Sequence, residues 1–129
     1  MSVAKSKEEK LRVKEFQKML EEELALIDSF MQPTTDTLLG MKRSLGLMGP
    51  EEVRKTLMDR IKTAGLLVWK FNSMAESYKV GLFEKLMKWV EKLKNILEEY
   101  GKKIGVEFFS IEVGLPLGVS ISFTFKPKG

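Results

Sequence analysis

Residues 109–125, FSIEVGLPLGVSISFTF, decide the fold class of this chain. The first half of this stretch alternates apolar side chains with Ser, Glu and Gly, and the second half alternates them with Ser and Thr. A period of two is typical of a β-strand with one buried face. The glycines and the proline between the halves are turn residues. The stretch therefore predicts an antiparallel β-hairpin, which we place at residues 106–126.

The chain before the hairpin has a helical period instead. Residues 5–31 carry apolar side chains every three or four positions, which predicts an amphipathic helix. Pro33 ends this helix, because the residue before a proline avoids the α conformation. Residues 33–49 contain three glycines and predict a linker with one short helix. Pro50, followed by two glutamates, marks the start of the next helix.

Residues 50–104 have two interpretations. Their apolar positions follow alternating steps of four and three, as in a coiled coil, and the seam is nearly continuous across Gly81. One continuous helix from residue 50 to 100 would be about 76 Å long. Ordinary globular helices are much shorter, so we favour a helical hairpin that turns near residues 79–81. Phe71 and Trp89 lie on the two seams, and we expect both to be buried.

These elements predict a single domain over residues 1–129. The expected fold class is α+β and mainly helical, with three main amphipathic helices, one short helix and a C-terminal antiparallel β-hairpin packed on the helices. Its length of 129 residues suits one domain with one core.

The composition excludes several kinds of chemistry. The chain has no Cys and no His, which rules out disulfides, thiolate nucleophiles, Cys/His zinc sites, His-ligated haem and the serine–histidine triad. Its densest carboxylate group is interpreted as a solvated helix face, because adjacent residues on a helix point about 100° apart and do not converge on one metal. The group comprises Glu21, Glu22, Glu23 and Asp28. We expect no enzymatic activity, no cofactor and no metal site.

The sequence also bears on the compartment. No apolar run approaches the roughly 20 residues that span a bilayer, and the charged first residues do not resemble a secretory signal, so we expect a cytoplasmic protein. Residues 81–104 have a basic amphipathic pattern, but glutamates offset the lysines, which disfavours a membrane partner. Asn and Gln are scarce beside abundant Lys and Glu, as in proteins from hot environments, whereas eight Met residues argue against that origin.

A net charge of +4 and a basic middle segment permit nucleic acid as a partner. Several of the basic residues are about one helical turn apart and predict a basic stripe. No helix-turn-helix pattern and no RNA-binding aromatic motif accompanies them. The candidate contacts for a nucleic-acid-binding accessory protein, which is our alternative function, are Lys42, Arg43, Arg54, Lys55, Arg60 and Lys62.

The hairpin favours a different function. Two strands alone are marginally stable in water and leave two unpaired edges. The polar face of the second strand carries Ser and Thr but no charges that would discourage pairing with another strand. We therefore expect a non-enzymatic interaction or assembly protein that forms a homodimer or higher homo-oligomer. The expected partners are other copies of the same chain and another protein. The expected interface residues are Val119, Ile121, Phe123 and Phe125.

Overall fold

The described part of the chain forms three α-helices followed by two strands. The computed structural model describes residues 3–31, 45–114 and 118–125. The helices are α1 (Val3–Met31), α2 (Pro50–Asn72) and α3 (Glu76–Tyr100), with 3-10 turns η1 at Leu45–Leu47 and η2 at Gly101–Ile104. The strands β1 (Val106–Gly114) and β2 (Gly118–Phe125) pair in an antiparallel hairpin. The predicted α+β, mainly helical fold class is confirmed.

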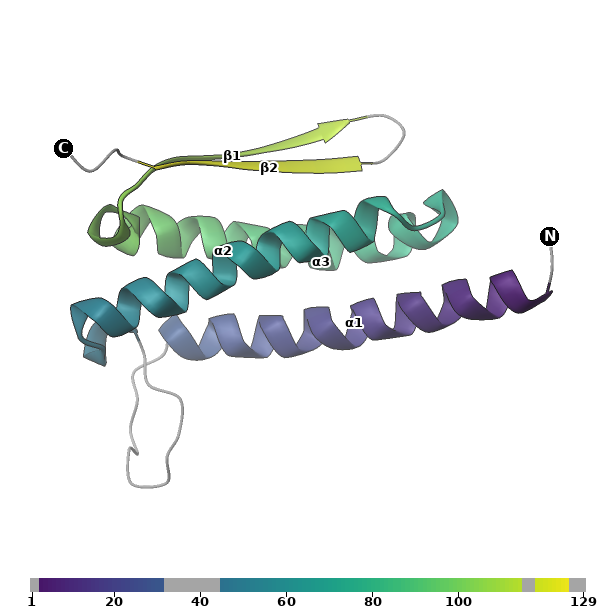
Figure 1. The fold of residues 1–129 in the computed structure, drawn as a ribbon, viewed down its shortest axis with the longest axis horizontal. Coiled ribbons are helices and arrows are strands. Elements are labelled where there is room, and N and C mark those ends of the chain that lie inside the picture. The colour runs from purple at the N-terminus through teal and green to yellow at the C-terminus, as the bar shows by residue number, and fades with distance from the viewer. Residues whose placement is uncertain (1–2, 32–44, 115–117, 126–129) are drawn as a thin grey trace, which may run out of the picture.

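The elements are arranged in three layers. α2 and α3 fold back on each other in the middle, α1 lies along one side of this pair, and the hairpin lies along the other side (Figure 1). This order lets the central pair bury apolar side chains on both sides. Of residues 33–49, which were expected to hold the short helix, residues 33–44 lie outside the described residues, and η1 is the helical turn in the described remainder.

The core forms where the helical seams meet. Phe71 and Trp89 have no exposed surface, which confirms the prediction that both are buried. The Phe71 ring lies 6.2 Å from that of Phe16 on α1 and 6.3 Å from that of Phe83 on α3, measured between ring centroids. These tilted ring pairs are a favourable aromatic geometry. Phe71 therefore joins all three helices at one point.

The turn between α2 and α3 is earlier than predicted. α2 ends at Asn72 and α3 begins at Glu76, so Gly81 lies inside α3 rather than at the turn. A mid-helix glycine costs only about 1 kcal/mol and does not force a break. The expected turn residue Lys79 is buried in the first turns of α3, with its ammonium 6.0 Å from the centroid of the Phe71 ring. A cation over an aromatic face is a stable arrangement even away from bulk water.

The carboxylates of α1 tie the helices together. Glu22 is exposed, as expected for a solvated face. Glu21 is exposed as well, whereas Glu23 and Asp28 are partly buried, which differs from the interpretation. All three form ion pairs across a helix–helix boundary. The pairs are Glu23 with Arg60 of α2, Asp28 with Lys92 of α3, and Glu21 with Lys85 of α3 at 3.4 Å.

A glycine in the left-handed conformation connects η2 to the first strand of the hairpin. Gly105 has φ of 83°, a conformation that glycine adopts without the steric cost of a Cβ. Cross-strand partners then run from Phe108 opposite Thr124 to Gly114 opposite Gly118, with an irregularity between Val106 and Phe108. The two isoleucines of the hairpin, Ile111 and Ile121, are directly opposite each other.

Candidate functional site

The side chain of Asn72 closes part of one edge of the hairpin. Its amide nitrogen donates to the carbonyl oxygen of Val119 at 2.7 Å, and its amide oxygen accepts from the backbone N–H of Val119 at 2.9 Å. One side chain at the end of α2 thus makes the two hydrogen bonds that a neighbouring strand would make. This contact fastens β2 to α2.

The same contact fixes the direction of the backbone groups in both strands. In an antiparallel pair, residues alternate between those that hydrogen-bond across the pair and those whose N–H and C=O point outward. Asn72 hydrogen-bonds to both the N–H and the C=O of Val119. Val113 and Val119 are therefore a pair whose backbone N–H and C=O groups point away from the partner strand. Ile111 and Ile121 pair two residues further along the strands, so their backbone N–H and C=O groups also point outward. Ile111 and Val113 therefore direct these groups to the outer edge of β1.

Replacing Asn72 with alanine tests the importance of this contact. Two hydrogen bonds to one backbone residue are lost, and we expect the free energy of unfolding to fall by about 1–2 kcal/mol. The amide of Val119 should exchange with solvent faster, measured by hydrogen exchange. Asn95, which is exposed on α3, provides the matched control, and alanine there should change stability by less than about 0.7 kcal/mol. Equal effects at both positions would contradict the role given to Asn72.

The helices cover the apolar face of the hairpin unevenly. Val119 is 3% exposed, whereas Val113, directly opposite on β1, is 49% exposed. Ile121 and Phe123 are half-buried and pack against the core, and Phe125 is 44% exposed. Of the four predicted interface residues, Val119 therefore faces the helices of its own chain, and Phe125 is the most accessible. Val113 on β1, which the sequence pattern did not single out as an interface residue, is more accessible than any of them.

The basic residues predicted to contact nucleic acid do not all belong to one stripe. Arg54, Lys55 and Lys62 are exposed on α2. Arg60 points the other way, and its side chain is only 14% exposed where it pairs with Glu23. Lys42 and Arg43 lie outside the described residues. Three exposed cations remain from the predicted set, and Asp59 is exposed on the same helix.

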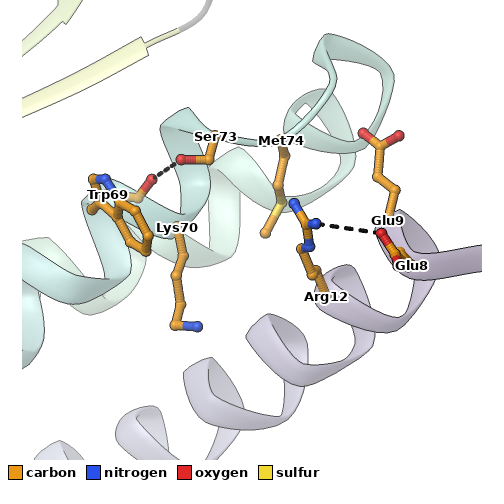
Figure 2. A pocket seen from close by; sticks show the side chains of 7 residues that line it. All are labelled: Glu8, Glu9, Arg12, Trp69, Lys70, Ser73 and Met74. Atoms are coloured by element: carbon orange, nitrogen blue, oxygen red, sulfur yellow. Dashed lines mark hydrogen bonds and ion pairs between the residues drawn. The ribbon is translucent and has the colours of Figure 1, made fainter. Parts of the chain in front are cut away.

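A groove between the start of α1 and the end of α2 is a second surface feature (Figure 2). Its volume is about 520 Å³, and Trp69, which is 67% exposed, forms part of its wall. Arg12 and Glu8 of α1 face the groove and are 3.8 Å apart in a loose ion pair. The sequence prediction did not name Trp69. Its position off the heptad seam of α2 is the signal that would have identified an exposed tryptophan.

The described residues contain no group of three carboxylates close enough to hold a metal ion. Within those same residues, no helix is both long and apolar enough to cross a bilayer. Comparisons of the chain with protein-family models, with curated proteins and with solved structures found no match.

Proposed function

We propose that this chain is a non-enzymatic interaction protein that assembles as a homo-oligomer, with the hairpin at the contact between copies. The observation that carries the proposal is the difference between the two valines of one cross-strand pair, 3% exposed at Val119 and 49% at Val113. The apolar face of the sheet extends beyond the helices that cover it. Burial of apolar surface is the main driving force for association, and an uncovered apolar face beside a strand edge favours it.

The exposed apolar side chains on α2 support a competing contact. Trp69 is exposed on the same helix as Leu66, which is 42% exposed. Tryptophan is enriched among the residues that dominate binding energy in protein interfaces. This helical surface therefore provides the natural comparison for the hairpin in any test of the interface.

Two single substitutions test whether the hairpin or the exposed apolar side chains of α2 form the contact between copies. Val113→Thr keeps the shape and the strand propensity of the side chain but adds a hydroxyl, which is costly only if association buries it. We expect it to weaken the oligomer about tenfold, equivalent to about 1.4 kcal/mol, in light-scattering measurements over a concentration series. Trp69→Ala should leave the association constant unchanged. The reverse pattern would place the contact on the helices.

A nucleic-acid-binding role is the second candidate, supported by the exposure of Arg54, Lys55 and Lys62 on one helix. We expect only weak, non-specific binding, in the range of about 10⁻⁴–10⁻⁶ M at physiological salt, that falls steeply as salt rises. Replacing all three with Gln should abolish this binding and leave the circular dichroism spectrum unchanged. Sequence-specific binding at nanomolar concentration would favour the nucleic-acid role over assembly.

A further inference from the structure

We infer that the outer edge of β1, rather than that of β2, pairs with a second copy of this chain, joining two hairpins into one four-stranded antiparallel sheet. The inference rests on the proposed homo-oligomer and names the edge that makes it. The sequence pattern alone had pointed to the apolar residues of β2.

The two edges of the hairpin differ in the partners that they already have. On β2, Asn72 takes the N–H and the C=O of Val119, and this strand lies against α2. On β1, no hydrogen bond among the described residues reaches the outward groups of Ile111 or Val113. An unpaired strand edge is a template for another strand. Asn72 therefore occupies the outward groups of Val119 on β2, whereas the outward groups of Ile111 and Val113 on β1 have no partner among the described residues.

The free edge is complementary to itself. When two identical strands meet antiparallel about a two-fold axis, each N–H of one copy faces a C=O of the other, so one edge supplies both halves of the contact. An axis at Ile111 places Glu112 opposite Ser110 of the second copy. Because like charges directly opposite each other are destabilising, this register is favoured over one in which Glu112 faces itself. The register also extends the sheet beside the half-exposed Val113.

The absence of cysteine from the chain allows a direct measurement of which strands meet. Ser110 of β1 and Ser122 of β2 are directly opposite each other, and their hydroxyl oxygens are 2.5 Å apart. The variants Ser110→Cys and Ser122→Cys, each carrying one nitroxide label, lose the same hydroxyl contact and so form a matched pair. Sedimentation of each labelled protein establishes first whether the oligomer is present.

Distances between the labels of two copies then identify the edge. If β1 pairs with β1 about an axis at Ile111, the two Ser110 positions lie one strand spacing apart and the two Ser122 positions lie three, with the same two-residue offset along the strands. The labels at Ser110 should therefore be closer than those at Ser122 by roughly 8 Å. Dipolar electron paramagnetic resonance measures this difference. A shorter distance at Ser122 would overturn the inference and leave the proposed hairpin contact intact. Labels too far apart at both positions within a proven oligomer would overturn the hairpin contact as well. A monomer would overturn both.

Proline substitutions provide a second readout. Ile111→Pro and Ile121→Pro each remove an outward N–H at opposite positions of one cross-strand pair, while the bonds between β1 and β2 are kept. We expect Ile111→Pro to weaken association by tenfold or more, and Ile121→Pro to change it much less. The opposite order would assign the contact to β2. Hydrogen exchange in the hairpin shows whether each variant retains the β1–β2 ladder.

Discussion

Replacing Phe71 with alanine is expected to lower the free energy of unfolding by about 3–5 kcal/mol. Phe71 has no exposed surface, and its ring contacts those of Phe16 and Phe83. Removing the ring therefore opens a cavity at the point where α1, α2 and α3 meet, and the cation over it, Lys79, loses its aromatic face. Urea unfolding followed by circular dichroism measures the change, and Trp89→Ala should behave similarly because Trp89 is equally buried.

Trp69 provides the matched control for these core variants. It is an aromatic residue on the same helix as Phe71, two positions away, but it is largely exposed. Trp69→Ala should therefore change the unfolding free energy by no more than about 0.5 kcal/mol. A loss under about 1 kcal/mol at both Phe71 and Trp89 would mean that the two seams do not form the core.

Replacing Glu23 with alanine is expected to cost about 3 kcal/mol, the second largest effect. Glu23 and Arg60 are 12% and 14% exposed, so removal of the carboxylate leaves a largely buried guanidinium without its counter-ion. The Nε of Arg60 is already buried with no hydrogen-bond partner among the described residues, so the remaining group would be wholly uncompensated. The loss should change little with salt, because buried pairs are weakly screened.

Replacing Glu21 with alanine tests whether the stability lost at Glu23 comes from burial of the ion pair or from loss of the charge alone. Glu21 pairs with Lys85 at 3.4 Å, but the two side chains are more than half exposed. Glu21→Ala should cost no more than about 0.5–1 kcal/mol, since exposed ion pairs contribute little. Equal losses at Glu21 and Glu23 in urea unfolding would contradict the role given to the buried pair.

Much of the fold was predictable because periodicity reports burial directly. The period of two in residues 119–125 and the three-to-four spacing in the helices identified the elements, and the seam positions Phe71 and Trp89 proved buried. The position of the α2–α3 turn was not predictable from glycine content. An Asn-Ser pair ends α2, and the hydroxyl of Ser73 donates to the carbonyl of Trp69, whereas Gly81 remains helical.

The candidate site was less predictable, because it depends on contacts between residues far apart in sequence. The alternation in β2 identified an apolar face but not which strand would pack more closely on the helices. That outcome depends on Asn72, which is 47 positions from Val119. For the same reason, the sequence placed Arg60 in a basic stripe, although its partner Glu23 is 37 positions away on α1.

The contacts of Val119 also determine where a strand-breaking proline can be placed. Ser122 is three residues from Val119 on β2, so its N–H points inward and donates to β1 rather than outward as at Val119. Proline at Ser122 would therefore break the hairpin itself and would not report on the edge alone. Substitutions at Ile111 and Ile121 avoid this, because their N–H groups point outward.

Sedimentation equilibrium of the full chain at micromolar concentration tests the central claim most directly. We expect a species of twice the mass of one chain, or a higher multiple, that dissociates on dilution and does not require nucleic acid. A single species with the mass of one chain across the whole concentration range would contradict it.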